Sequence, residues 1–233
     1  MDRPDLMSAP LSETLNVRAR QSGYGSYCRC ISRIGVAVTF TTLLAVGFAQ
    51  GDVVDECGTR SRPDRAVVAC SQLLEAFPNS WSAHYNRGIA HRARGDTDEA
   101  MHDFNKAIHL NPQAWQPYYS RGRIHLDRND FDQAIEDFST SLAIRGNNAL
   151  AYNARAWARY KHGRLSDAMT DVNRAIAFDP GYAAAYDTRA HIYEHQGRRE
   201  EAIADYRKAL ALDPTNNLAH ITRKGLERLG AKP

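Results

Sequence analysis

The sequence lacks the signatures of most enzyme sites. It has no glycine-rich phosphate loop, no nucleophile elbow and no carboxylate pair suited to acid–base catalysis. It also lacks a strong charge of one sign, because 30 Lys and Arg residues stand against 27 Asp and Glu residues. Five of these bases and three of these acids lie in the first 49 residues, so residues 50–233 carry a net charge of only +1. A body this close to neutral lacks the positive field that nucleic-acid binding requires, so no nucleic-acid partner is expected.

The composition is that of a chain that can bury a core. Of its 233 residues, 43% are hydrophobic, 24% are charged and 9% are aromatic. These values exclude collagen-like, low-complexity and wholly disordered proteins.

An apolar segment without a charge spans residues 34–49. It follows four basic residues, Arg18, Arg20, Arg29 and Arg33. This order is typical of a secretory signal peptide, and the small residues Gly47 and Ala49 predict cleavage after Ala49. The protein is then exported to the periplasm or the cell exterior. Two alternatives stay open: residues 34–49 are an uncleaved membrane anchor, which would be the chain's one contact with a membrane, or translation starts later, for example at Met7.

Cysteine is scarce. Cys28 and Cys30 lie in the predicted signal peptide, so the mature chain keeps only Cys57 and Cys70. No C-x-x-C spacing of a metal site is present. An oxidising compartment would favour a disulfide between Cys57 and Cys70, and the alternative is two free thiols.

Residues 81–216 repeat one 34-residue pattern without insertion or deletion. The four units are residues 81–114, 115–148, 149–182 and 183–216. Four columns hold small or large apolar residues at helical spacing: Gly88, Gly122, Ala156 and Ala190; Ala100, Ala134, Ala168 and Ala202; Phe104, Phe138, Val172 and Tyr206; and Ala107, Ser141, Ala175 and Ala209. Small side chains let two helices approach closely, so each unit is expected to be a pair of short antiparallel helices.

Turn-forming residues fall where such helix pairs would reverse. Those inside the units accept a left-handed backbone and are Gly95, Asn129, Gly163 and Gly197. Those between units are Pro112, Gly146, Pro180 and Pro214. No proline interrupts the interior of an expected helix.

These columns closely resemble the tetratricopeptide repeat, a 34-residue family. The resemblance implies an all-α fold, an α-solenoid of antiparallel helix pairs that forms a right-handed superhelix. Residues 50–80 resemble an N-terminal half-repeat that carries the possible disulfide. Residues 217–233 resemble a C-terminal capping helix that covers the last apolar face. The chain departs from the family pattern at Ala156 and Ala190, where Gly is usual, and at Gly146, where Pro is usual.

An Arg stands eight residues before each turn residue, and an Asp stands eight residues after it. The pairs are Arg87 with Asp103, Arg121 with Asp137, Arg155 with Asp171, and Arg189 with Asp205. Equal distances from the turn put both side chains at one level of a helix pair, where a guanidinium can meet a carboxylate. We interpret these residues as structural ion pairs, and a row of anion-binding arginines is the alternative.

In this family the first helices of the units line the inner, concave face, where ligands mainly bind. The resemblance assigns to that face Tyr85, Ile89, Arg92, Tyr119, Arg123, Leu126, Asp127, Asn153, Trp157, Tyr160, Lys161, Asp187, His191, Glu194 and His195. Aromatic residues with nearby Arg are common anchors of protein interfaces. They predict a non-catalytic scaffold of the cell envelope that binds a protein or peptide without a cofactor or metal.

A carboxylate clamp, by which some family members hold chaperone tails, is disfavoured here. The clamp needs Lys, Asn and Arg at positions that this chain fills with Tyr85, Ile89, Ser120, Leu150 and Ala154.

Two other functions stay open, as does the oligomeric state. His191, Glu194 and His195 match the H-x-x-E-H motif of inverted zinc proteases, and two His residues four apart share a helix face. A third ligand would have to come from the few residues that follow, and the repeat register alone already predicts a helix here. A zinc-dependent hydrolase is therefore the less favoured alternative, beside a structural subunit of an envelope assembly.

We expect the exported protein to begin at Gln50, because small residues precede the predicted cleavage point. N-terminal sequencing of the exported fraction checks this. An Ala49→Arg variant should keep its signal segment, since a large side chain at the cleavage point blocks processing. Full-length protein that stays in the membrane fraction would instead identify residues 34–49 as an anchor.

Overall fold

The computed structural model describes residues 53–214 and 219–232. The chain divides into two units, residues 1–48 and 49–233, and every described residue lies in the second unit. The predicted signal peptide therefore lies outside the described residues. The described part is helical and contains no strand. Among its helices, none combines the length and the apolar character needed to cross a membrane.

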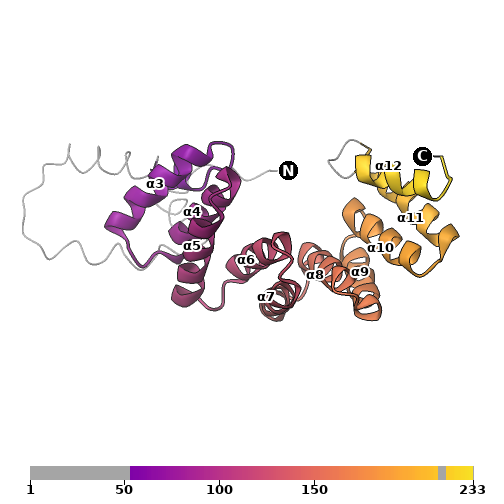
Figure 1. Ribbon diagram of the computed structural model, residues 1–233. Helices are drawn as coiled ribbons and strands as arrows, with labels where there is room; N and C mark the ends of the chain where they lie inside the picture. Colours follow the sequence, from indigo (N-terminus) through magenta and orange to yellow (C-terminus); the bar gives the residue numbers. More distant parts are fainter. Residues whose placement is uncertain (1–52, 215–218, 233) are drawn as a thin grey trace, which may run out of the picture. The chain divides into compact units, whose positions relative to one another are not determined.

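Helices follow one another in antiparallel pairs along the described chain (Figure 1). A short helix at residues 53–57 is followed by α3 (Pro63–Ala76), α4 (Trp81–Arg94), α5 (Thr97–Leu110), α6 (Trp115–Asp127), α7 (Phe131–Ile144), α8 (Ala149–Lys161), α9 (Leu165–Phe178), α10 (Ala183–His195), α11 (Arg199–Leu212) and α12 (Ala219–Arg228). Each of the four 34-residue units holds one pair, from α4 with α5 to α10 with α11.

The turn within each pair adopts the left-handed backbone expected from its residue type. The φ angles are 89° at Gly95, 63° at Asn129, 82° at Gly163 and 73° at Gly197. Among the described residues, Asn129 is the one non-glycine residue with a positive φ. Asparagine tolerates this conformation better than other side chains do, so it can replace glycine in the second unit.

Close approach of the two helices explains the column of small residues. A Cβ atom on Gly88 would lie 2.7 Å from Cε1 of Phe104, and one on Gly122 would lie 2.9 Å from Cε1 of Phe138. The third unit has Val172 in place of Phe, and Ala156 stands opposite it with both residues fully buried. In the third unit the exchange of Gly for Ala thus accompanies a smaller partner, whereas in the fourth unit Ala190 packs in one buried cluster with the larger Tyr206.

The four Arg–Asp pairs form in the same geometry in every unit. Nε and Nη2 of each Arg donate to the two carboxylate oxygens of its Asp at 2.6–3.0 Å. The Asp residues are buried, with exposed fractions of 1% to 7%. Two parallel hydrogen bonds satisfy each carboxylate and join the two helices of one unit.

The third guanidinium nitrogen of each Arg reaches the unit before it. Nη1 of Arg87, Arg121, Arg155 and Arg189 donates at 2.6–3.2 Å to Ser71, Asn105, Ser139 and Asn173 respectively. These acceptors recur every 34 residues as Ser or Asn. Each Arg thus bonds within its own unit and across to the preceding one. The sequence analysis missed this acceptor column, although its fixed register would have revealed it.

The two ends of the array are closed by different means. At the N-terminal end, α3 packs on α4, and Cys70 occupies the position that Phe104 fills in the next unit. At the C-terminal end, α12 packs on α11, and a Cβ on Gly225 would lie 2.6 Å from Cζ of Tyr206. Because Gly225 has no Cβ, α12 can pack directly on the Tyr206 ring.

The Arg189→Leu variant should lower the free energy of unfolding by about 3 kcal/mol, because it leaves the carboxylate of Asp205 buried without its partner. Arg155→Leu should cost less, since Nη1 of Arg159 also donates to Asp171 at 2.6 Å. Urea unfolding followed by circular dichroism measures both changes.

The matched control is Arg198→Leu, which breaks an exposed pair with Glu201 and should change stability little. If Arg189→Leu kept full stability but abolished ligand binding, the arginine row would be a ligand site rather than a structural element.

Candidate functional site

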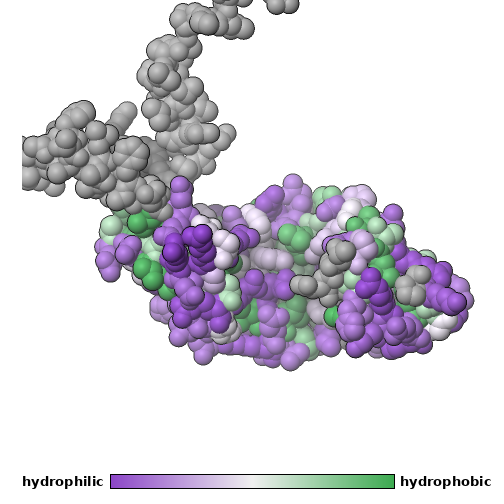
Figure 2. Space-filling view, turned by 90° about the horizontal axis from the view of Figure 1, so that it is seen from above, coloured by the Kyte–Doolittle hydropathy of each residue, from purple (hydrophilic) through white to green (hydrophobic). Residues whose placement is uncertain are grey.

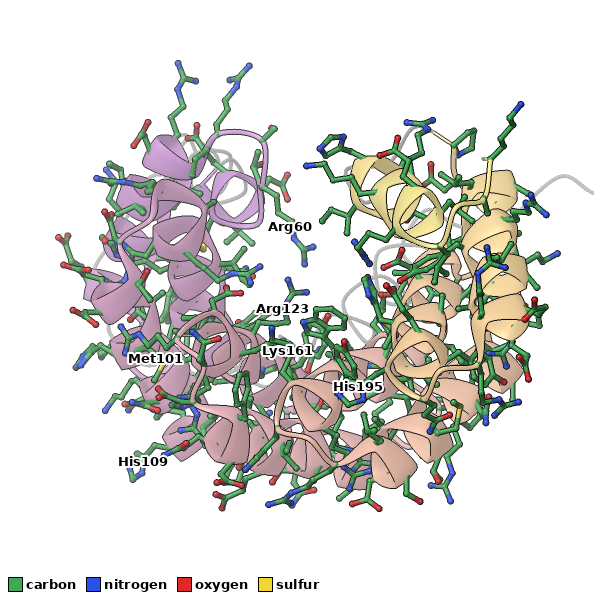
Figure 3. All side chains as sticks on the ribbon, turned by 45° about the vertical axis from the view of Figure 1, so that its right-hand side comes forward. Arg60, Met101, His109, Arg123, Lys161 and His195 are labelled. Atoms are coloured by element: carbon green, nitrogen blue, oxygen red, sulfur yellow. A yellow bond between two sulfur atoms is a disulfide. The ribbon has the colours of Figure 1, made fainter. Side chains whose placement is uncertain are left out.

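The first helices of the units form the inner face of the array. α4 contacts α6, α6 contacts α8, and α8 contacts α10, so these helices lie side by side. Figure 3 shows Arg123 and Lys161 pointing into the space on this inner side, whereas His109 of α5 points to the opposite side. The residues assigned above to a ligand-binding surface come from these first helices.

The inner face divides into residues that are available to a ligand and residues that pack. Asn153 and Asp187 were expected to bind ligand, but they are only 8% and 6% exposed. Oδ1 of Asp187 accepts a hydrogen bond from Oγ1 of Thr222 in α12 at 2.5 Å. Both side chains are thus buried, which leaves little of their surface for a ligand.

Aromatic side chains gather where α8 meets α10. The Trp157 ring lies 5.2 Å from Tyr160 and 5.5 Å from His191, measured between ring centroids. His195 stands edge-on to Tyr160 at 6.1 Å. Trp157 and Tyr160 stay partly exposed, whereas His195 is exposed. This cluster offers a ligand an apolar surface with polar edges.

The Tyr119 ring, on the neighbouring helix α6, packs 5.7 Å from Phe138. Its hydroxyl lies 3.5 Å from Nη1 of Arg123. Tyr182 also lies near Arg123, and burial raises the pKa of its hydroxyl. The sequence analysis missed Tyr182 because it precedes α10 rather than lying within a first helix.

A polar network anchors α12 on the fourth unit. Oη of Tyr206 donates to Oε2 of Glu194 at 2.7 Å, and Arg228 donates two hydrogen bonds to the same carboxylate. The Arg228 guanidinium lowers the pKa of Glu194. Nδ1 of His191 lies 3.0 Å from the Tyr206 oxygen, whose proton is already given to Glu194, so His191 donates this bond.

This network engages two of the three residues of the H-x-x-E-H motif, His191 and Glu194, and leaves Nε2 of His191 without a hydrogen-bond partner among the described residues. Glu194 is held by Tyr206 and Arg228, and His191 has only Nε2 left, which lies 3.6 Å from Oδ2 of Asp187. Burial lowers the pKa of His191 and raises that of Asp187. Within residues 53–214 and 219–232, no group of three or more His, Cys, Asp or Glu side chains is placed to hold a metal ion. Of the motif residues, His191 and Glu194 take part in the attachment of α12 through Tyr206 and Arg228, whereas His195 is exposed.

A cavity of about 410 Å³ opens between the N-terminal segment and the inner face. Its lining includes Cys57 and Arg60 from that segment, Ile89 and Arg92 from α4, and Asp127 from α6. The sequence analysis missed Arg60, because it stands outside the repeats. Sγ of Cys57 and Sγ of Cys70 are paired 2.11 Å apart, so this pair joins the segment that carries Arg60 to α3 in the structure.

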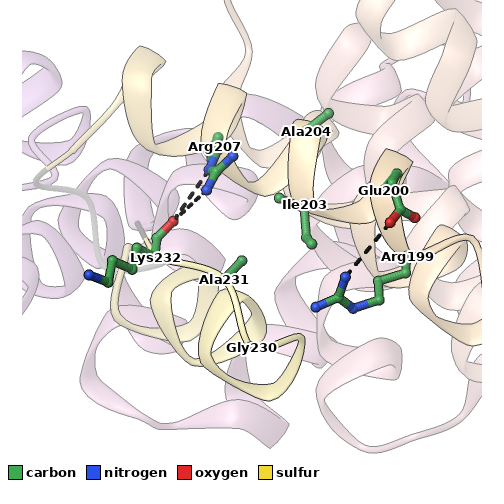
Figure 4. Close-up of a pocket in the computed structure, with 8 residues that line it drawn as sticks. All are labelled: Arg199, Glu200, Ile203, Ala204, Arg207, Gly230, Ala231 and Lys232. Carbon is green, nitrogen blue, oxygen red and sulfur yellow. Dashed lines mark hydrogen bonds and ion pairs between the residues drawn. The ribbon is translucent and has the colours of Figure 1, made fainter.

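A second cavity, of about 540 Å³, lies between α11 and the last residues of the described chain (Figure 4). Its two arginines form hydrogen bonds to backbone carbonyl groups. Arg207 donates to the carbonyl oxygen of Lys232 at 3.1 and 3.3 Å, and Arg199 donates to the carbonyl oxygen of Leu229. This cavity therefore marks where the chain end docks on α11.

Comparison with protein families identifies the repeats. Family models described as tetratricopeptide repeat match residues 81–113, 119–183 and 183–216, which together make up more than half of the chain. The chain belongs to the tetratricopeptide repeat (TPR) family. A search of the curated proteins found no match.

Solved TPR structures share this fold. One described as "Crystal structure of MamA" is 22% identical, with 77% of this chain and 97% of that chain covered and a TM-score of 0.59. MamA from Desulfovibrio magneticus RS-1 is 19% identical, with 72% and 96% covered and a TM-score of 0.64. YrrB, described as a TPR protein with an unusual peptide-binding site, is 20% identical, with 79% and 89% covered and a TM-score of 0.57. At these identities the likeness establishes the fold alone.

Reduction of the disulfide should loosen the N-terminal edge of the TPR array. Dithiothreitol should lower the free energy of unfolding by roughly 3 kcal/mol, the chain-entropy value for a loop of this size. It should also speed amide exchange in residues 53–60, while α8 and α9 stay unchanged. Unfolding and hydrogen–deuterium exchange measure the two effects.

A Cys57→Ser, Cys70→Ser variant should show no response to dithiothreitol and serves as the control. Mass spectrometry of the exported protein after alkylation without reductant provides an independent check. Alkylation of both thiols would contradict the disulfide.

Proposed function

We propose that this TPR protein is a non-catalytic scaffold that binds a protein or peptide through its inner face. The observation that carries the proposal is the partly exposed aromatic cluster of Trp157 and Tyr160, which lies beside Tyr119 and Arg123 on adjacent first helices. Aromatic rings and Arg contribute much of the energy of protein interfaces, because each combines a large contact area with a polar group. The peptide-binding site named for YrrB adds support by analogy.

The surface outside the inner face offers less to a ligand. Figure 2, by contrast, shows the array from above, the side toward which Arg123 and Lys161 point in Figure 3, and hydrophobic areas lie there among hydrophilic ones. The exposed large hydrophobic residues are Val68, Phe77, Leu150, Phe178 and Ile221, which lie on different helices or on a helix end. Single exposed apolar side chains are normal on soluble domains and do not by themselves mark an interface.

We further propose that the protein works in the cell envelope after export. The basic and apolar N-terminal sequence supports this location, and so does the Cys57–Cys70 pair, since disulfides persist mainly in oxidising compartments. A structural subunit of an envelope assembly is the second candidate. It is favoured only if binding depends on surfaces other than the inner face.

In-cell crosslinking and affinity capture of the tagged full-length protein, analysed by mass spectrometry, test the proposal. The Tyr119→Ala, Trp157→Ala double variant should lose a partner that the unmodified protein captures, because both changes remove aromatic contact area from the inner face. Phe178→Ala removes an exposed aromatic ring from the second helix α9 and should keep the partner.

Circular dichroism of the variants confirms that they are folded. If the double variant and the unmodified protein capture the same partners, the interface lies elsewhere and the structural-subunit function is favoured.

A further inference from the structure

We infer that the inner face selects an acidic peptide segment, with Arg123 and Lys161 as its main contacts and Arg60 and Arg92 at one edge. This inference rests on the proposed function and names the chemistry of its ligand. It differs from the carboxylate clamp of the family, because the clamp positions are occupied by other residue types in this chain. These four cations form no ion pair in the described part of the chain.

Most arginines near the helix contacts are matched by an acid. The four repeat arginines bond their buried Asp residues, Arg159 bonds Asp171, and Arg228 bonds Glu194. In the described part of the chain, Arg60, Arg92, Arg123 and Lys161 form no ion pair. Figure 3 shows Arg60, Arg123 and Lys161 pointing into the same space from the N-terminal segment, α6 and α8. Several unmatched positive charges therefore converge on one face.

Arg123 is partly buried. Its Nε is buried and has no hydrogen-bond partner among the described residues. Among the described residues, its guanidinium makes one hydrogen bond, from Nη1 to the hydroxyl oxygen of Tyr119 at 3.5 Å. A guanidinium with buried and unused donors loses hydration without full compensation. A ligand carboxylate can supply the missing acceptors in the planar, two-bond geometry that the repeat arginines make with Asp.

The acids on this face do not cancel the positive charge. Asp127 lies close enough to contribute to the raised pKa of Arg123, and it also lines the 410 Å³ cavity with Arg60 and Arg92. Asp187 is buried against Thr222, and Glu194 is held by Arg228 and Tyr206. On the described first helices, Arg92, Arg123 and Lys161 thus share the inner face with one exposed carboxylate, Asp127, so this face is electrostatically complementary to an acidic segment.

The aromatic cluster indicates that the ligand also carries apolar or aromatic groups. Trp157 and Tyr160 lie on the same helix as Lys161, and Tyr119 lies one turn before Arg123. Rings next to cations favour a peptide that alternates Asp or Glu with apolar or aromatic residues. A highly charged polymer without apolar groups would leave these rings without contacts. This chemistry favours an acidic peptide over a nucleic acid, which also agrees with the near-neutral body of the chain.

Selection from a phage-displayed library of random 12-residue peptides tests the inference. The unmodified protein should enrich peptides that contain several Asp or Glu residues together with an apolar or aromatic residue. A synthetic copy of an enriched peptide should bind at least tenfold more weakly when its Glu and Asp residues are replaced by Gln and Asn. Its affinity should also fall as salt is raised.

The Arg123→Gln, Lys161→Gln variant should weaken binding of that peptide at least tenfold. The matched control is Arg174→Gln, Lys208→Gln, which removes the same charge from exposed positions on α9 and α11 and should change binding less than twofold. Circular dichroism verifies the fold of both variants.

Three results would overturn the inference. Enrichment of peptides without acidic residues, with binding still dependent on Tyr119 and Trp157, would reject the acidic ligand and leave the proposed function intact. Equal losses in the two charge variants would indicate only general attraction. Tighter binding of a 12-nucleotide single-stranded DNA than of any selected peptide would identify a nucleic-acid surface instead.

Discussion

The array depends on one contact that recurs in every unit. In it, an arginine of the first helix bonds a buried Asp of the second helix and a Ser or Asn of the preceding unit. Arg155, for example, donates two hydrogen bonds to Asp171 and a third to Ser139 of the preceding unit. One side chain thereby fixes the level of the two helices in its own unit and the register of that unit on its neighbour. A solenoid is stabilised by such nearest-neighbour contacts, because its repeats have no common central core.

Tight helix pairing and this contact require each other. The Arg can reach its Asp only if the two helices lie close, and Gly88 permits that approach by leaving no Cβ to meet Phe104. The ends of the array lack one neighbouring unit, so they use other means. The Cys57–Cys70 pair holds the N-terminal segment. Helix α12 is held by the bonds of Arg228 to Glu194 and by the packing of Gly225 on the Tyr206 ring.

The pairing of charges within the fold also determines which cations of the inner face are available to a ligand. Buried carboxylates bind the repeat arginines, so those cations are unavailable to a ligand. Arg123 and Lys161 form no ion pair in the described part of the chain, and Lys161 lies on the same helix as Trp157. Arginine therefore has two roles in this protein. Where it bonds a buried Asp it holds the helices together, and where it forms no ion pair it is available to a ligand.

The sequence by itself determined the helix pairs, their turns and the Arg–Asp levels, because these follow from local spacing that repeats four times. Asn129 in a left-handed turn was predictable from its residue type alone. Tertiary structure decided which inner-face residues stay open. Asp187 lies in the expected column, yet α12 covers it, and Arg60 lies outside the repeats, yet it points to the inner face. The burial of Asp187 and the direction of Arg60 depend on contacts between segments that are distant in the sequence. The local spacing of residues does not encode such contacts.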